Sequence, residues 1–286
     1  INPCHGPDEI WVPSRFNFET FSRSGIPAGK IHVVPIGIDA QKYQADVVKP
    51  LPIPGKKAFV FLSVFGWTNR KGWDVLIKAY LNAFLQSDDV VLVIHAWNEM
   101  GKSIQKEVNH FVASLGRDPT SIPTIMAMEG HLTSSEMASL YRAADAFVLP
   151  TRGEGWGLPF MEAMAMGLPT IGTRWSAHLD FMHDRNSYLI DCRVTDIPDH
   201  LLGEPPLYRI FFEGHRWAEP SVEHTARLMR EVYDHPERAK EKGLFARNEI
   251  HQRFNNESVA QIVIENLKRI EESELFKSRK RGERQP

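Results

Sequence analysis

The segment from Leu149 to Thr173, which reads LPTRGEGWGLPFMEAMAMGLPTIGT, constrains the fold of this chain more than any other. The apolar residues Ala146–Leu149 predict a buried strand, and three glycines fall within five positions of the loop that follows. Pro159 suits the start of a helix over Phe160–Met166, because the amide hydrogen that it lacks would be unpaired there anyway. A short apolar run after this helix predicts the next strand. In open α/β sheets, such a loop lies at the carboxyl ends of the strands, where ligands bind.

The loop and the helix start have a distinctive chemistry. Glycines let backbone amides approach a ligand closely, and a helix N-terminus is a natural seat for phosphate. Glu154 in the loop and Glu162 one turn into the helix flank this seat. Carboxylates would repel phosphate, so they are better suited to accept hydrogen bonds from hydroxyls. A diphosphate between two hydroxyl-bearing rings is a nucleotide sugar. A simpler alternative is that the glycines only form a tight turn and that Glu162 only interacts favourably with the helix dipole. This alternative explains each residue separately but not why the two glutamates and the glycines occur together.

The rest of the chain alternates between apolar strand segments and amphipathic helical segments. Strands alternating with helices at this spacing predict an α/β fold with a parallel sheet flanked by helices and right-handed crossovers. Residues 195–218, with prolines at 198, 205 and 206, are expected to be irregular. The other predicted elements are strands at 58–64, 90–95, 123–128 and 188–190, helices at 73–84, 102–115 and 133–144, and three helices after residue 221.

Composition excludes several classes of function. The formal net charge of −2 gives no global field that favours nucleic acid or a membrane. No apolar run is long enough to span a bilayer. Cys4 and Cys192 are too few for a disulfide framework, which favours a reduced compartment, and we expect a cytoplasmic protein. The twelve histidines show no metal-binding spacing, and neither a P-loop nor a dinucleotide fingerprint occurs. The basic C-terminal tail is interpreted as a solvated end.

A second loop, FGWTNRKG at residues 65–72, also joins a predicted strand to a helix. Arg70 and Lys71 in this loop could neutralise a diphosphate, although an exposed pair is the simpler interpretation of two adjacent cations in isolation.

Three other residues that could contact a ligand also have simple structural interpretations. His95 is interpreted as a polar residue at a strand end whose hydrogen bonds are made within the protein. Trp156 is as well suited to packing in the core as to stacking on a ligand ring. Trp175 and residues 214–221 are expected to pack on the far side of the domain.

The pattern of Glu154, seven residues and Glu162, with GWGLP between them, resembles the motif of the retaining GT-B glycosyltransferases of family 4, also called glycosyl transferases group 1. The resemblance implies that Glu154 contacts the donor sugar and that Glu162 contacts the nucleotide ribose. It also implies that the backbone between them meets the sugar and the diphosphate. That backbone comprises Gly155, Trp156, Gly157 and Leu158.

Two further loops match the family pattern. Lys71 and Gly72 take the place of a Lys-Gly pair whose lysine grips the diphosphate. The Gly-Arg that precedes this pair in the family is absent, since Trp67 follows Gly66, and Arg70 is the candidate substitute cation. A third loop, which in the family contacts the nucleotide base largely through its backbone, corresponds to Gly130, His131 and Leu132.

The resemblance also predicts the domain organisation. The start of the chain is similar to the end of the family's N-terminal domain, with a strand at 9–13, a helix at 16–24 and a strand at 30–34, although Ile36 stands where Asn is usual. We therefore interpret residues 1–39 as a remnant of that domain, 40–57 as a linker, 58–255 as the Rossmann-like donor-binding domain, and 256–286 as a crossover helix, over 256–272, with the basic tail. Because the chain begins with Ile1, we expect it to be a piece of a longer protein.

The reaction implied is transfer of a sugar, of the hexosyltransferase type, from a nucleotide diphosphate to an acceptor hydroxyl with retention of configuration. Lys71, Arg70 and the helix amides near Leu158 would stabilise the charge that grows on the diphosphate, and Glu154 would orient the donor ring. The expected catalytic set is therefore Lys71, Glu154 and Arg70. No metal or other cofactor is expected, since the family generally works without one. The acceptor, which could be a glycan, a lipid or a small molecule, is unknown, and the isolated chain is expected to bind donor weakly and to transfer little.

Two other functions stay open on the sequence. A glycoside hydrolase could use Glu154 and Glu162 as acid and base, although the phosphate seat and the Lys71 loop have no role in that mechanism. Release of sugar from a simple glycoside without a nucleotide would favour it. A non-catalytic module that binds nucleotide sugars is the second. Binding without turnover, even when the rest of the N-terminal domain is supplied, would favour that function.

Overall fold

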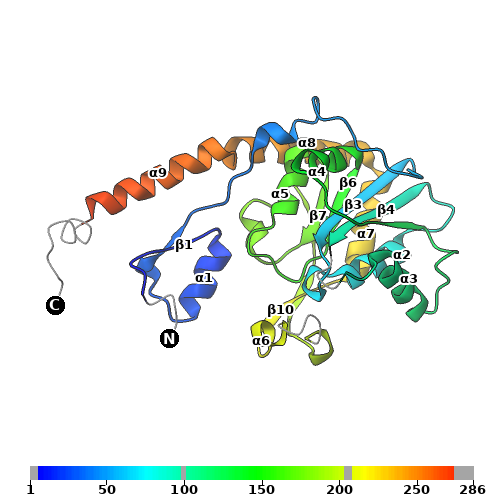
Figure 1. Ribbon diagram of the computed structural model, residues 1–286, viewed down its shortest axis with the longest axis horizontal. Helices are drawn as coiled ribbons and strands as arrows, with labels where there is room; N and C mark the ends of the chain where they lie inside the picture. The colour runs from blue at the N-terminus through cyan, green and yellow to red at the C-terminus, as the bar shows by residue number, and fades with distance from the viewer. Residues whose placement is uncertain (1–5, 98–100, 203–207, 274–286) are drawn as a thin grey trace.

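A six-stranded parallel sheet forms the centre of the computed structural model, which describes residues 6–97, 101–202 and 208–273 (Figure 1). The strand order is β5-β4-β3-β6-β7-β8, and every pairing is parallel. This confirms the predicted α/β fold class. The strands are β3 (Phe59–Gly66), β4 (Val90–Trp97), β5 (Thr124–Met128), β6 (Ala146–Leu149), β7 (Thr170–Thr173) and β8 (Tyr188–Ile190).

The central strands are apolar along almost their whole length. All residues between the two ends of β3 are buried, and so is every residue of β4 except Trp97. The two strands pair from Phe59 opposite Val90 to Gly66 opposite Trp97. Continuous burial is typical of strands in a parallel sheet whose two faces are both covered by helices. The helices that flank the sheet are α2 (Trp73–Ala83), α3 (Ile104–Ser114), α4 (Ser134–Ala143), α5 (Leu158–Met166), α7 (Val222–Asp234) and α8 (Pro236–Arg253).

The start of α4 shows how local sequence fixes an element boundary. Thr133 accepts a hydrogen bond from the backbone N–H of Glu136, and the Glu136 carboxylate accepts one from the backbone N–H of Thr133 at 2.7 Å. This reciprocal capping box satisfies two amide groups that the first turn of a helix otherwise leaves unpaired. The sequence of residues 133–136, TSSE, has the typical pattern of such a box.

The order of the strands places the functional loops. The chain builds one half of the sheet with β3, β4 and β5, and then returns to the centre to build the other half with β6, β7 and β8. Strands β3 and β6 are therefore direct neighbours, paired through Phe61 with Ala146 and Leu62 with Phe147. In open α/β sheets, ligands bind where the strand order reverses in this way. The loops after β3 and β6, which carry Lys71 and Glu154, meet at this point.

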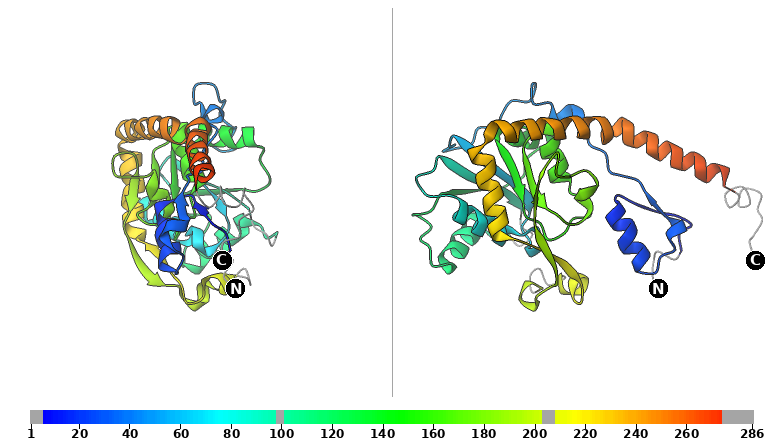
Figure 2. Two further views of the ribbon diagram at one scale, coloured as in Figure 1. Left: turned by 90° about the vertical axis from the view of Figure 1, so that its left-hand side faces the viewer. Right: turned by 180° about the vertical axis from the view of Figure 1, so that it is seen from behind.

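A small unit at the N-terminus lies beside the main sheet. Strands β1 (Ile10–Val12) and β2 (Ile31–Val33) pair in parallel, helix α1 (Arg15–Arg23) connects them, and the unit has its own small core. Helix α9 (Asn256–Glu272) runs out from the main body toward this unit (Figures 1 and 2). Arg269 on α9 donates to both carboxylate oxygens of Glu9, at 2.6 and 2.8 Å. The helix thus returns to the N-terminal unit, as expected of residues 256–272. The domain boundaries themselves stay predictions, and the basic tail lies outside the described residues.

The segment between β8 and α7 differs from its prediction. Instead of an irregular stretch over 195–218, strands β9 (Cys192–Asp196) and β10 (Arg216–Pro220) form an antiparallel pair, with the short helix α6 (Tyr208–Phe212) between them. The prediction was wrong because both strands are only five residues long and carry charged residues, so neither has a clear apolar alternation. Of all the helices in the described residues, none is long and apolar enough to cross a membrane.

Candidate functional site

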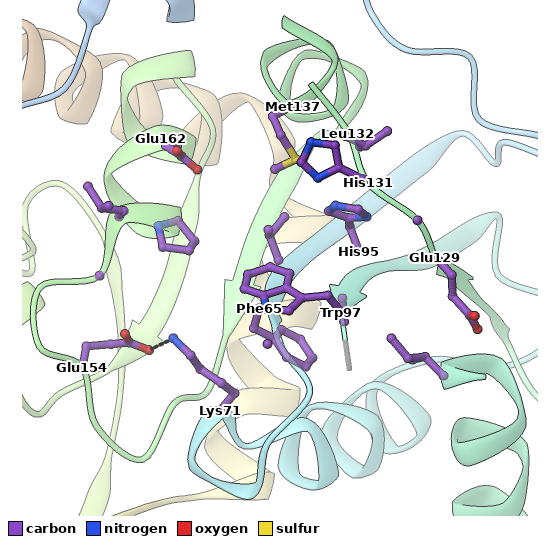
Figure 3. Close-up of a pocket in the computed structure, with 18 of the residues that line it drawn as sticks. Phe65, Lys71, His95, Trp97, Glu129, His131, Leu132, Met137, Glu154 and Glu162 are labelled. Atoms are coloured by element: carbon purple, nitrogen blue, oxygen red, sulfur yellow. Dashed lines mark hydrogen bonds and ion pairs between the residues drawn. The ribbon is translucent and has the colours of Figure 1, made fainter. Parts of the chain in front are cut away.

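A cavity of about 900 Å³ opens at the carboxyl ends of strands β3, β4, β5 and β6 (Figure 3). Its volume lies in the range of small-molecule sites. The loops after these strands and the first turn of α5 supply the walls. Most of the predicted site residues are brought together here. Those that line the cavity are Lys71, Gly130, His131, Leu132, Glu154, Trp156, Gly157, Leu158 and Glu162.

Arg70 and Gly155 are the two predicted site residues that do not line this cavity. Both line a smaller hollow on the other side of the Glu154 loop. Arg70 and Lys71 are consecutive residues of a 3₁₀ turn, Asn69–Lys71, and their side chains contribute to different cavities. Arg70 therefore does not share the wall of the large cavity with Lys71, and its role as the substitute cation stays a prediction. The guanidinium of Arg70 nevertheless lies 3.6 Å from a carboxylate oxygen of Glu154.

Glu154 and Lys71 form a tight ion pair across the switch point. The Nζ atom of Lys71 lies 2.6 Å from Oε1 of Glu154, and the two side chains are only 11% and 6% exposed (Figure 3). Burial alone would raise the pKa of the Glu154 carboxyl. The adjacent charges of Lys71 and Arg70 outweigh burial and hold this pKa below its ordinary value. Glu154 is therefore a carboxylate near neutral pH and can accept hydrogen bonds but not donate one.

Two hydroxyl side chains fix the position of Glu154. The Thr151 hydroxyl donates to Oε1 of Glu154 at 2.9 Å. The Ser176 hydroxyl accepts from the backbone N–H of Glu154 at 2.8 Å and donates to its carbonyl oxygen at 2.6 Å. Ser176 has a φ of 90°, which is rare for a residue with a side chain. Sequence reasoning missed Ser176, because nothing local marks a serine 22 residues downstream as a partner of the loop.

Arg152 ties the same loop to two other parts of the chain. Its side chain is 2% exposed and forms paired hydrogen bonds with both Asp74 on α2 and Glu219 on β10, at 2.7–2.9 Å. It also donates to the carbonyl oxygen of Asn69, at 2.6 Å, in the turn that carries Lys71. Burial alone would lower the pKa of the guanidinium, but the two carboxylates raise it. Arg152 thus holds the Lys71 turn and the Glu154 loop in one arrangement, a role that the sequence did not reveal.

Strand β10 and Trp175 lie against this loop rather than on the far side of the domain. The Trp217 ring packs under the Arg152 guanidinium, 5.1 Å from ring centre to Cζ, and the backbone N–H of Ala218 donates to the carbonyl oxygen of Arg152 at 3.1 Å. Trp175 lines the smaller hollow together with Gly153. The expected far-side location of Trp175 and residues 214–221 is therefore wrong, because β10 returns to the loop after β6.

A glycine permits the close approach of the two loops. Gly72 has a φ of +67°, and a Cβ atom there would lie 2.0 Å from the carbonyl oxygen of Pro150. Any side chain would force the Lys71 turn away from the strand end of β6. Gly157 serves the helix start in a similar way, since its φ is +98° and a Cβ atom would come within 3.2 Å of both Phe160 and His178. These two glycines are required by backbone geometry.

Glu162 lies on the cavity wall and is held by two tyrosines. The Tyr141 hydroxyl on α4 donates to Oε2 of Glu162 at 2.8 Å, and the Tyr43 hydroxyl donates to the same carboxylate. Burial raises the pKa of Glu162 above its ordinary value, and the two hydroxyl hydrogen bonds oppose that shift. Tyr43 is buried and ends a 3₁₀ turn, Ala40–Tyr43, in the segment interpreted as a linker. Part of that segment therefore supports the site.

The structure also shows where Trp156, His95 and His131 lie. Trp156 is 4% exposed and packs against Phe181 and Phe254, with ring centres 5.2 and 5.9 Å away, so packing dominates although the residue also lines the cavity. His95 is buried, and its Nδ1 lies 3.0 Å from the carbonyl oxygen of Met128, as expected of a satisfied strand-end residue. Burial lowers the pKa of His95, so a neutral imidazole lines the cavity. Figure 3 shows His131 away from Glu154, near Met137.

Comparison with known proteins gives a consistent result. A sequence profile of the family described as Glycosyl transferases group 1 matches residues 56–202. The chain is 27% identical to mannosylfructose-phosphate synthase of Agrobacterium fabrum over 157 residues, covering 52% of this chain and 34% of that protein. It is 25% identical to the GDP-mannose-dependent alpha-(1-6)-phosphatidylinositol monomannoside mannosyltransferase of Mycobacterium tuberculosis over 205 residues, covering 67% of this chain and 50% of that protein. The chain thus spans about a third to a half of the length of these relatives.

Solved structures share the fold at low sequence identity. A glycosyltransferase from Rickettsia africae superposes with a TM-score of 0.70 at 15% identity, covering 93% of this chain and 64% of that one. HepE of Anabaena, in complex with UDP and glucose, gives a TM-score of 0.67 at 16% identity, covering 91% and 63%. The C-terminal domain of a glycosyl transferase group 1 protein from Francisella tularensis gives 0.57 at 19% identity, covering 77% of this chain and all of that domain.

Proposed function

This chain belongs to the glycosyl transferases group 1 family, and we propose that it is the donor-binding part of a glycosyltransferase that moves a hexose from a nucleotide diphosphate to an acceptor hydroxyl with retention of anomeric configuration. One observation carries the proposal. A carboxylate paired with a buried lysine and a second carboxylate held by tyrosines line one cavity at the switch point, together with the start of α5. Two carboxylates that can accept hydrogen bonds from hydroxyls lie on either side of a position suited to phosphate. This order matches the sugar, diphosphate and ribose of a nucleotide sugar.

The proposed chemistry follows from where charge develops. As the glycosidic bond of the donor breaks, its electron pair stays with the diphosphate. Lys71 and the backbone amide of Leu158 at the start of α5 are fixed in place before the reaction and would stabilise that charge. Lys71 would then exchange part of its contact with Glu154 for the phosphate. Arg70 lies outside the cavity wall, and we propose that it acts through Glu154, which its charge helps to keep ionised.

Glu154 and Glu162 have different proposed partners. Glu154 is a carboxylate beside the phosphate seat, and we propose that it accepts hydrogen bonds from hydroxyls of the donor ring and so orients the anomeric carbon. Glu162 would accept hydrogen bonds from the ribose hydroxyls. The base would lie toward residues 130–132, on the opposite wall. The printed name of one relative specifies GDP-mannose, and one structural relative was solved with UDP, so we propose a GDP- or UDP-linked sugar as the donor.

Replacement of Glu162 by glutamine tests the proposed ribose contact. Glu162→Gln keeps the shape of the side chain but removes its charge, and loss of a charge-assisted hydrogen bond costs about 1.5–3 kcal/mol. We expect the affinity for UDP or GDP, whichever the parent chain binds, to fall by at least about tenfold in calorimetric titrations. The matched control is Glu249→Gln, because Glu249 is partly buried and contacts Asn186 and His183 instead. Equal affinities for the parent chain and Glu162→Gln would remove Glu162 from the site.

The hydrogen bond from Tyr141 to Glu162 predicts how nucleotide affinity depends on pH. Burial places the pKa of Glu162 above its ordinary value, so the carboxylate gains a proton, and the ribose acceptor is lost, as the pH falls through that raised pKa. Tyr141→Phe removes a hydrogen bond that opposes the shift, so the pKa rises further. We expect nucleotide affinity in this variant to decline at a higher pH than in the parent chain. Tyr80→Phe is the control, since Tyr80 is buried but bonds to backbone carbonyls. Superimposable profiles of affinity against pH for the parent chain and Tyr141→Phe would contradict the assignment.

A further inference from the structure

A second hollow, of about 260 Å³, lies on the other side of the Glu154 loop from the donor cavity. Glu154 lines both spaces, whereas Lys71 lines only the larger one and Arg70 only the smaller one. The hollow is therefore separated from the donor cavity by one loop, and it shares with that cavity the carboxylate that we assign to the donor ring. A molecule bound in it would lie on the other side of the Glu154 loop from a donor sugar in the large cavity.

Aromatic side chains from separate parts of the chain form the walls of this hollow. Phe16 comes from α1, Trp175 follows β7, and Phe212 and Trp217 come from the β9–β10 segment. The backbone N–H of Arg15 donates to Asp180 at 2.8 Å and anchors α1 here, and the Phe16 ring meets the Trp175 ring edge-on at 5.3 Å. Of the four aromatic residues only Trp175 falls inside the range matched by the family profile, residues 56–202. Membership of the family therefore does not predict these walls.

The cations around the hollow each have a carboxylate close by. Arg152 is neutralised by Asp74 and Glu219, the Arg70 guanidinium lies 3.6 Å from Glu154, and the Arg216 guanidinium lies 3.6 Å from Asp196. The hollow therefore has no large surplus of positive charge that would select a phosphate. Its walls combine apolar rings with hydrogen-bonding groups of fixed position. This combination suits a neutral molecule that has an apolar face and a polar edge.

We propose that this hollow holds one sugar ring of the acceptor. The C–H face of a pyranose is apolar and packs on aromatic rings, while its hydroxyls at the edge reach carboxylate, guanidinium and backbone groups. The volume lies below the range of about 300–1,000 Å³ for drug-sized ligands, so a single ring fits and an oligosaccharide does not. The assignment rests on the proposed function, because an acceptor is expected here only if the neighbouring cavity binds a donor. The chain would thus supply an acceptor seat of its own.

Saturation-transfer NMR on the 286-residue chain tests the proposal. The probes are methyl α-D-mannopyranoside and methyl α-D-glucopyranoside at millimolar concentration, measured with and without UDP or GDP. We expect saturation of the sugar ring protons in the parent chain. In Trp175→Ala and in Phe212→Ala the signal should fall by about fivefold or more, because each variant removes one aromatic wall. Nucleotide affinity should stay within about twofold in both variants. Phe212 and Trp175 are both partly exposed, so at least one variant is expected to fold, which urea denaturation checks.

Trp97→Ala is the reciprocal control, because Trp97 lines the donor cavity and not the hollow. It should leave the sugar signal in place and weaken nucleotide binding. The proposal is overturned if neither glycoside gives a signal with the parent chain, if folded Trp175→Ala and Phe212→Ala keep the full signal, or if only Trp97→Ala removes it. A sugar signal that depends on Trp175 in a chain that binds no nucleotide would support the hollow as a sugar site and would reject the proposed donor function, so the two failures are distinguishable.

Discussion

Replacing Arg152 by methionine is expected to lower the free energy of unfolding by about 3 kcal/mol, which is the scale for breaking a buried ion pair by removing one partner. The guanidinium is almost fully buried between Asp74 and Glu219 and donates to the carbonyl oxygen of Asn69. Methionine fills similar space but leaves two carboxylates facing each other without a cation. Because Glu219 is 38% exposed and can reorient toward water, we place the expected loss at the lower end of the range. Urea denaturation followed by circular dichroism measures it.

The control for this prediction is Arg174→Met. Arg174 also forms paired hydrogen bonds with a carboxylate, that of Asp184, at 2.6 and 3.0 Å, but both side chains are exposed. Exposed ion pairs contribute about 0–1 kcal/mol, so this variant should stay close to the parent chain. If Arg152→Met and Arg174→Met destabilised the chain equally, Arg152 would not be the tie that holds the Lys71 turn against the Glu154 loop.

Replacing Lys71 by methionine is expected to weaken binding of a nucleoside diphosphate by about tenfold to one-hundredfold, because a charge-assisted hydrogen bond to phosphate is lost. Lys71 also helps to hold the pKa of Glu154 below its ordinary value, so that pKa rises without it. This second effect concerns the contact proposed with the donor sugar, which UDP and GDP lack. Binding of the nucleoside without phosphates should change little. Calorimetric titration of both ligands against both proteins separates the phosphate contact from a general loss of the site.

Lys242→Met is the matched control. Lys242 is a partly buried lysine that donates to the backbone carbonyls of Asp184 and Ser187, on elements outside the cavity wall. Its loss is expected to affect stability and to leave diphosphate affinity unchanged. A Lys71→Met protein that is folded and binds the diphosphate as tightly as the parent chain would show that Lys71 does not meet the phosphate.

The features that could be predicted from the sequence are those encoded locally. The strands over residues 146–149 and 188–190 match the structure at both ends, since apolar runs bounded by turn residues mark buried strands. The capping box at Thr133 involves only residues 133–136, so it too is encoded by the local sequence. The positions of Lys71 and Glu154 followed from a physical rule, because loops after neighbouring parallel strands share one edge of the sheet.

The features that could not be predicted depend on contacts between distant residues. Arg152 reaches Glu219 across 67 positions and Asp74 across 78, and its own neighbours in the sequence describe only a polar loop. Tyr43 contacts Glu162 from a segment without periodicity. Arg70 and Lys71 line different cavities while both approach Oε1 of Glu154, and this depends on a 3₁₀ turn that their sequence does not specify. A tightly packed buried network of this kind is a property of the folded chain, so it becomes visible only when the elements are placed in space.

The central claim is that the cavity at the switch point binds a nucleoside diphosphate, and one set of calorimetric titrations tests it most directly. The 286-residue chain is titrated with UDP, GDP and ADP, and with uridine, guanosine and adenosine, in buffer containing EDTA. Because Lys71 and the α5 amides are proposed to meet the phosphate charge without a metal, we predict that one diphosphate binds with a micromolar to millimolar Kd and at least about tenfold more tightly than its nucleoside. If no diphosphate bound more tightly than its nucleoside, or if binding required added Mg²⁺ or Mn²⁺, the proposed donor site would be wrong.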